Sequence, residues 1–179
     1  AWFVAFPAMT WTEDTGRTLS IAAVQGGGPQ GTRAINSDPR EVIERHLQAS
    51  RSIDSDADNP IDLVVWPENV IDVLDFESST ELQEITAQAL RLNSPFSVGI
   101  TEDVNQQHFT NAQVIVTPDG QVVDRYDKVR RVPFGEYMPM RSFLASLGAP
   151  VDQVPRDALA GSGPAYLDVP TASGSERIS

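Results

Sequence analysis

Two side chains with complementary acid–base chemistry, Glu68 and Lys128, each come shortly after a predicted strand. Glu68 follows the apolar run 61–66 and Pro67, which ends the strand and fixes the direction in which the chain leaves it. Because sites in open α/β sheets gather outside the carboxyl ends of the strands, Glu68 lies where a general base would lie. An ordinary strand-end carboxylate is the alternative interpretation.

Lys128 is the only lysine among 179 residues, in a chain with a formal net charge of −12. It stands in the run RYDKVRRVPFGEYMP, residues 125–139, where every other basic residue is arginine. A compact ammonium can donate to an oxygen that becomes negative during a reaction, and a planar guanidinium suits that task less well. A solvated surface lysine is the alternative, but the rigid, apolar run 132–136 that follows favours a site.

Further polar residues near these two have open roles. Glu136 could orient Lys128, act as a second carboxylate, or close a turn with a hydrogen bond. Asn111, at the start of a predicted hairpin strand, is expected to cap a turn. A local cationic patch is predicted that could attract a phospholipid headgroup or simply balance nearby acids, and it consists of Arg125, Arg130 and Arg131.

Composition excludes several classes of function. The absence of cysteine removes disulfides, thiolate metal sites and a cysteine nucleophile from this sequence. His46 and His108 are far apart, so no metal site is predicted, and no cofactor is predicted either. With 25 acidic against 13 basic residues, the chain lacks the broad cationic face that nucleic acid requires. The glycine-rich run 26–31 has no Gly-Lys-Ser/Thr ending, which argues against a phosphate loop.

The elements that must position these residues follow an α/β pattern. We expect strands over 19–25, 61–66, 95–101, 109–117 and 121–126, two further strands at 165–169 and from 176 onward, and helices over 38–52, 80–92 and 140–147. The 118–120 turn, Pro-Asp-Gly, predicts a hairpin between the fourth and fifth strands. One domain is the prediction for a chain of this length.

Four stretches together resemble the nitrilase superfamily of carbon–nitrogen hydrolases. They are AVQGGGPQ from 23, VVWPEN from 64, FTNA from 109 and the run 125–139 quoted above. The Trp-Pro-Glu stretch is shared by many nitrilases. The Tyr-x-Lys run with Val-Pro-Phe-Gly-Glu is similar to the membrane branch, the apolipoprotein N-acyltransferases. The fold that this resemblance implies is an α/β nitrilase-like αββα sandwich, incomplete at its C-terminal part.

The resemblance implies roles for individual residues. Glu68 matches the general base, Lys128 the lysine that stabilises the oxyanion, and Glu136 a further glutamate near the site. Contacts to substrate are expected from Arg130, Arg131, Phe134 and Tyr137. The family's nucleophilic cysteine has no match, so residues 19–179 are interpreted as a domain truncated before the nucleophile. Residues 1–18 are interpreted as a linker or the end of a membrane-spanning region.

The implied activity is transfer of an acyl chain from a phospholipid to the N-terminal amino group of a diacylglyceryl-cysteine lipoprotein, through a thioester. The implied place is the bacterial inner membrane, with the catalytic domain on the extracytoplasmic side. By itself the chain is expected to be inactive. A soluble nitrilase-type amidase, or a non-catalytic module that binds lipid or protein, are the alternatives.

Overall fold

The computed structural model describes residues 18–28, 38–54, 58, 60–172 and 174–179. Residues 1–17, almost all of the segment interpreted as a linker or the end of a membrane-spanning region, therefore lie outside the described residues, as does the second half of the glycine-rich run. No helix within the described ranges is long and apolar enough to cross a membrane.

Two amphipathic helices begin and end at residues suited to those positions. Helix α1 (Pro39–Arg51) starts at Asp38, whose carboxylate accepts the N–H of Arg40 at 2.9 Å, and proline takes the first helical position. Helix α2 (Thr80–Leu92) starts at Ser79 and ends at Asn93 in the left-handed conformation. Both helices agree with the predicted ranges to within a residue or two.

The main sheet combines parallel and antiparallel strands. Its central order is β1 (Ile21–Ala23), β2 (Leu63–Val65), β4 (Phe96–Asn105), β5 (His108–Val116) and β6 (Val122–Asp127), with β3 (Ile71–Val73) beside β4 and β7 (Asp157–Ala158) beside β5. Strands β1, β2 and β4 run parallel, and β4, β5 and β6 are antiparallel. The carboxyl end of β2 therefore lies on the same side of the sheet as that of β6.

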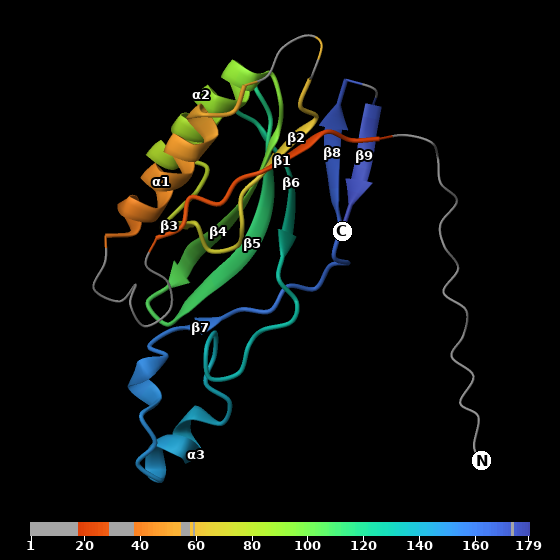
Figure 1. The fold of residues 1–179 in the computed structure, drawn as a ribbon. Coiled ribbons are helices and arrows are strands. Elements are labelled where there is room, and N and C mark those ends of the chain that lie inside the picture. Colours follow the sequence, from red (N-terminus) through yellow and green to blue (C-terminus); the bar gives the residue numbers. More distant parts are fainter. Residues whose placement is uncertain (1–17, 29–37, 55–57, 59, 173) are drawn as a thin grey trace, which may run out of the picture.

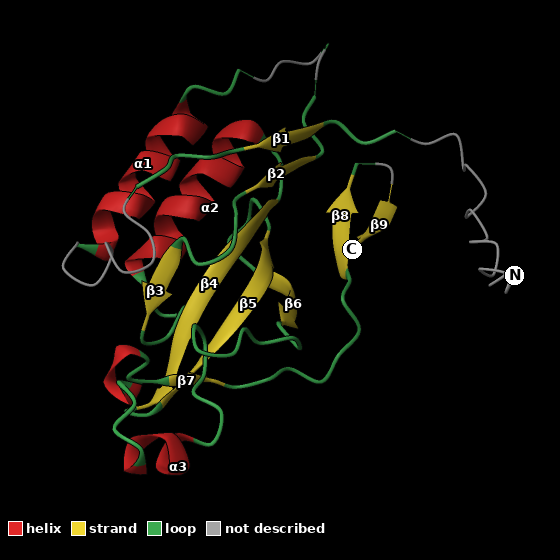
Figure 2. Ribbon diagram, turned by 60° about the horizontal axis from the view of Figure 1, so that its bottom comes forward, coloured by secondary structure: helices red, strands yellow, loops and turns green. Residues whose placement is uncertain are grey.

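The molecule has layers on both faces of this sheet. Helices α1 and α2 lie side by side on one face, and the separate antiparallel pair β8 (Leu167–Thr171) and β9 (Gly174–Ile178) lies on the other (Figures 1 and 2). The helix side holds the larger core, around Trp66, Phe76 and Phe96. A smaller core joins Leu63 and Ile115 to Leu167 and Val169 of β8.

A long segment between β6 and β8 projects from one end of the sheet. It contains helix α3 (Arg141–Ser146) and a short 3-10 helix (Val151–Gln153), and it returns to the sheet through β7 (Figure 1). Ion pairs of Arg141 with Asp157 and of Arg156 with Asp103 hold this segment against the sheet.

The predicted helices and seven strands are present, with ends shifted by a few residues. Two short strands, β3 and β7, were not expected. Each pairs along only part of a longer central strand. Neither carries an apolar run long enough to stand out in the sequence.

Candidate functional site

Glu68 is positioned by the buried end of β2. Trp66 is fully buried, and its indole Nε1 donates to Ser50 Oγ of α1 at 3.0 Å. The Trp66 backbone N–H donates to Ser97 O at 2.8 Å, and its carbonyl accepts the Gln113 amide at 3.1 Å. These contacts fix the point at which the chain leaves the sheet, two residues before Glu68.

The loop that carries Glu68 lies directly over Gly99 of β4. A Cβ atom on Gly99 would stand 2.3 Å from Pro67 O and 2.5 Å from Glu68 Cα, which no side chain can tolerate. The Val70 N–H donates to Gly99 O at 3.2 Å and ties the other end of the loop to the same place. Glycine at position 99 therefore allows the Glu68 backbone to pack against the sheet.

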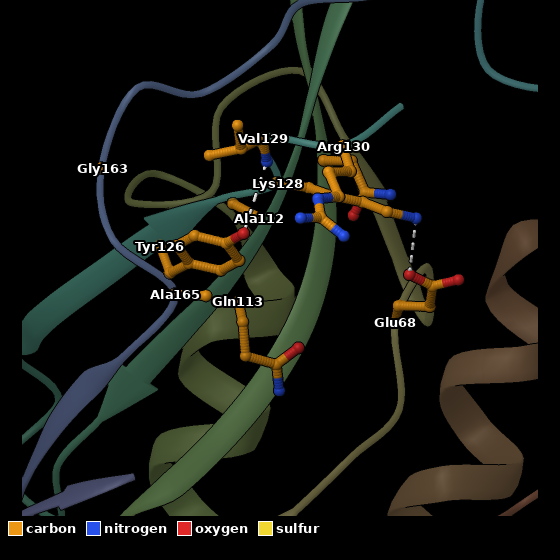
Figure 3. Close-up of a pocket in the computed structure, with 10 residues that line it drawn as sticks. Glu68, Ala112, Gln113, Tyr126, Lys128, Val129, Arg130, Gly163 and Ala165 are labelled. Carbon is orange, nitrogen blue, oxygen red and sulfur yellow. Dashed lines mark hydrogen bonds and ion pairs between the residues drawn. The ribbon is translucent and has the colours of Figure 1, made fainter. Parts of the chain in front are cut away.

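Lys128 is held by its own backbone immediately after β6. Its N–H donates to Asn111 O of β5 at 2.8 Å, and its carbonyl accepts the Gly161 N–H at 3.0 Å. Its ammonium Nζ donates to Glu68 Oε2 at 3.1 Å and to Glu136 Oε1 at 2.7 Å (Figure 3 draws the contact with Glu68). Two residues that are 60 positions apart in the sequence thus meet across the edge of the sheet.

The two carboxylates beside Lys128 differ in their surroundings. The Glu136 side chain is only 14% exposed. Its Oε1 accepts from Lys128 and, at 3.4 Å, from the Asn111 amide, while its Oε2 accepts the Val132 N–H at 2.8 Å. The Glu68 side chain is 60% exposed and uses one oxygen on Lys128. Glu136 thus both orients Lys128 and closes the turn that precedes it, whereas the second oxygen of Glu68 has no hydrogen-bond partner within the described ranges.

Burial and hydrogen bonding oppose each other at this cluster. Burial of Glu136 favours the neutral carboxyl, but the hydrogen bonds from Lys128, from the Val132 N–H and from Asn111 outweigh it, and the pKa of Glu136 lies below its ordinary value. Burial likewise favours a neutral amine at Lys128, yet the hydrogen bonds to Glu136 and Glu68 raise the pKa of Lys128 above its ordinary value. Lys128 is therefore a cation at neutral pH.

A cavity of about 590 Å³ opens beside this cluster. Its lining consists of Glu68, Asn111, Ala112, Gln113, Tyr126, Lys128, Val129, Arg130, Gly163 and Ala165. A second hollow of about 350 Å³, mostly apolar, adjoins it and shares Glu68, Gln113, Tyr126 and Ala165. An extended molecule with a polar centre and an apolar tail would fit this pair of hollows.

Of the four residues expected to contact substrate, Arg130 lines the cavity. Arg131 turns away, donating to Ala158 O at 2.8 Å with its guanidinium 4.3 Å from the Tyr137 ring centroid. Phe134 is exposed on the turn with a φ of 63°. Neither it nor Tyr137 lies among the residues that line the cavity.

One expectation from the sequence differs from the structure: Asn111 does not cap a turn, because its amide reaches Glu136. Of the two alternatives for the arginine patch, Arg125 follows the second, because it balances the nearby acids Glu102 and Asp127. Gln113 and Tyr126 also line the cavity and were not predicted. Side chains alternate along a strand, so residues 111 and 113 lie on one face of β5, and residues 126 and 128 lie on the same face beside them on and just after β6. This alternation was the signal that could have found both residues.

No group of three or more histidine, aspartate or glutamate side chains in the described ranges is placed to hold a metal ion. The charged groups that line the cavity are the Glu68 carboxylate, the Lys128 ammonium and the Arg130 guanidinium, beside the neutral polar groups of Asn111, Gln113 and Tyr126.

Comparison with known proteins shows which family this chain is similar to. The carbon–nitrogen hydrolase family matches residues 20–170. Apolipoprotein N-acyltransferase from Vibrio cholerae is 32% identical over 155 residues, covering 83% of this chain and 30% of the relative; that from Allorhizobium ampelinum is 30% identical, covering 76% and 26%. The chain thus spans less than a third of the length of these relatives.

Solved structures show the same fold at low sequence identity. A CN-hydrolase superfamily protein from Xanthomonas campestris superposes with a TM-score of 0.53 at 20% identity, covering 87% of this chain and 50% of that one. An N-terminal amidase gives 0.57 at 13% identity, covering 88% and 35%. The expected nitrilase-like α/β sandwich is confirmed. Because the family matches residues 20–170, most of its sequence, this chain belongs to the carbon–nitrogen hydrolase family.

Proposed function

We propose that this chain is part of an apolipoprotein N-acyltransferase, in which Glu68, Lys128 and Glu136 form the acid–base and electrostatic part of the active site. The single observation that carries the proposal is the Lys128 ammonium bridging Glu68 and Glu136 beside a cavity. The relatives of that name supply the reaction class.

The surroundings of the two carboxylates assign them different tasks. Glu136 accepts three hydrogen bonds and is mostly buried, so its oxygens are engaged and it serves to hold Lys128. Glu68 has an oxygen without a partner in the described part of the chain and faces the cavity. Glu68 is therefore the proton acceptor, because a general base must reach its proton directly.

The proposed reaction has two halves. Glu68 takes the proton of a cysteine thiol, the thiolate attacks the ester carbon of a phospholipid acyl chain, and Lys128 stabilises the oxyanion. The ester C–O bond breaks, the lysophospholipid oxygen takes the proton from Glu68, and a thioester remains. The amino group of a diacylglyceryl-cysteine lipoprotein then attacks the thioester and passes a proton to Glu68. The C–S bond breaks, and the leaving sulfur takes that proton from Glu68, so that the thiol and the Glu68 carboxylate are restored.

The sequence contains no cysteine, so the thiol is proposed to come from residues beyond 179, as the resemblance implies. Residues 19–179 would then be most of the catalytic domain and 1–18 a linker to, or the end of, a membrane span. The proposed location is the bacterial inner membrane, with the site on its extracytoplasmic side. Arg130, Arg131, Phe134 and Tyr137 remain predicted substrate contacts.

A chimera tests the proposal with the family's own assay. Residues 20–170 would replace the matching segment of the Vibrio cholerae relative, and mass spectrometry would follow acyl transfer from phospholipid to a diacylglyceryl lipopeptide. We expect turnover that falls by two to three orders of magnitude in Lys128→Met, as for loss of an oxyanion donor, and at least as much in Glu68→Gln.

Thermal unfolding of each chimera separates a folding failure from a catalytic one. A folded chimera that transfers no acyl chain, or one in which both substitutions leave turnover intact, would overturn the assignment. Hydrolysis of small amides without transfer to the lipopeptide would favour the amidase alternative.

A further inference from the structure

Arg130 differs from every other arginine in the described ranges. The others are engaged: seven pair with carboxylates, and the remaining two, Arg91 and Arg131, donate to backbone carbonyls. Among the residues that the structure describes, Arg130 has no hydrogen bond, ion pair or aromatic contact. In a chain with nearly twice as many acidic as basic residues, a guanidinium without a carboxylate partner stands out.

Arg130 also stands at the proposed active site. It lines the cavity of about 590 Å³ that Glu68 and Lys128 line, two residues after Lys128 (Figure 3). The backbone there is held by the Val129 N–H, which donates to the Tyr126 hydroxyl at 3.4 Å, and by the contacts of Lys128 described above. The guanidinium is therefore carried by a fixed backbone at the rim of the cavity.

Of the two cations that line the cavity, Lys128 is paired with carboxylates, and Arg130 has a charge that no carboxylate in the described ranges offsets. Glu68 and Glu136 carry two negative charges, and Lys128 offsets one of them while donating to both. Without Arg130 this cluster would repel an anion, and the chain's net charge of −12 adds to that repulsion. A guanidinium presents a planar fork of donors that matches two oxygens of a phosphate.

We propose that Arg130 binds the phosphate of the phospholipid acyl donor and so places the ester carbon beside Lys128. This assignment rests on the proposed function. In a glycerophospholipid the phosphate and the acyl esters share one glycerol unit, so a phosphate at Arg130 brings an ester to the neighbouring Lys128. Arg131 and Arg125 do not share this role, because each is already engaged elsewhere.

The lone lysine makes the test specific. Protein labelled with ¹³C at lysine Cε gives one lysine signal, from Lys128 in the cavity. The probes would be dihexanoylphosphatidylglycerol below its micellar concentration, dihexanoylglycerol, which lacks the phosphate, and inorganic phosphate. We expect the phospholipid to shift the Lys128 signal saturably, and to bind at least tenfold more tightly than either of the other two.

Substitutions then identify the residue. Arg130→Gln should weaken the phospholipid by about tenfold to a hundredfold, the usual value of a charged hydrogen-bonded contact, and leave dihexanoylglycerol unchanged. Arg130→Lys should recover part of the loss. Arg45→Gln, which removes an exposed arginine paired with Glu41 on α1, is the matched control and should change nothing.

Three results would overturn the proposal: equal affinity for phospholipid and dihexanoylglycerol, equal or tighter binding of inorganic phosphate, or full phospholipid affinity in Arg130→Gln. Because binding is measured without turnover, its failure is distinct from failure of the chimera assay. If the titration shows phosphate recognition by Arg130 but the chimera transfers no acyl chain, the anion site at Arg130 stands and only the proposed enzyme activity is overturned.

Discussion

Replacing Gly99 by alanine should separate Glu68 from Lys128 without touching either side chain. The new Cβ would meet Pro67 O at 2.3 Å, and ordinary contact begins at 3.4 Å, so the loop must retreat by about 1.1 Å. The Glu68–Lys128 distance of 3.1 Å would then grow to about 4 Å, beyond hydrogen-bonding range. Overpacking of this kind costs about 1–3 kcal/mol of stability.

Two measurements follow this displacement. In the ¹³C-lysine spectrum the pKa of Lys128 should fall toward its ordinary value, because the hydrogen bond to Glu68 is one of the contacts that raise it. In the chimera, acyl transfer should fall by about a hundredfold, as expected for a misplacement of roughly 1 Å. Glu68→Gln should shift the titration in the same direction.

The matched control is Val98→Ala, a buried neighbour on β4 whose loss destabilises the sheet by about 2 kcal/mol without entering the Glu68 loop. It should lower stability and leave the Lys128 titration as in the original protein. If Gly99→Ala unfolds at the same denaturant concentration and shows an unchanged Lys128 titration, the close approach does not position Glu68.

Further predictions concern the same cluster. Glu136→Gln should lower the free energy of unfolding, measured in urea, by about 1–3 kcal/mol, because it weakens a set of partly buried hydrogen bonds. The pKa of Glu136 lies below its ordinary value, so its contribution to stability is present above the ordinary pKa and is lost as the pH falls through the lowered one; the variant should lose less stability over this acidic range. Trp66→Phe removes the hydrogen bond to Ser50 and leaves a cavity in the larger core, so it should lower the free energy of unfolding by about 2–3 kcal/mol in the same assay; unchanged stability would contradict a structural role for Trp66. The chain by itself, which has no cysteine, should transfer no acyl group to a lipopeptide, and measurable transfer would contradict a cysteine mechanism.

Much of the fold could be predicted from the sequence, because the local sequence signals agree with the helices and strands that form. Asp38 and Pro39 mark the start of α1, and the Pro-Asp-Gly turn at 118–120 joins β5 to β6. The apolar run before Pro67 is a strand covered on both faces, as such runs usually are. These features depend on residues that are close together in the sequence, and such local structure can be predicted from a single sequence.

The site could be predicted from the sequence only in part. The rule that sites lie at the carboxyl ends of strands placed Glu68 and Lys128 on one edge, but it could not give their distance. That distance depends on Gly99 and Gly161, whose close contacts involve residues far away in the sequence. Asn111 was missed as a partner of Glu136 for the same reason, because the contact joins β5 to the turn after β6.

The geometry also explains why lysine stands where arginine otherwise prevails. An ammonium has three donor hydrogens, and two of them are used on Glu68 and Glu136. The third remains for an oxygen in the cavity. An arginine would present a planar fork that pairs bidentately with one carboxylate, and its bulk would displace the Glu68 loop, which Gly99 already holds at minimal distance. Lys128→Arg should therefore keep the positive charge and most of the stability, yet lose acyl transfer in the chimera as completely as Lys128→Met. Substantial activity in the arginine variant would mean that charge alone, rather than a point donor with a spare hydrogen, is what the position supplies.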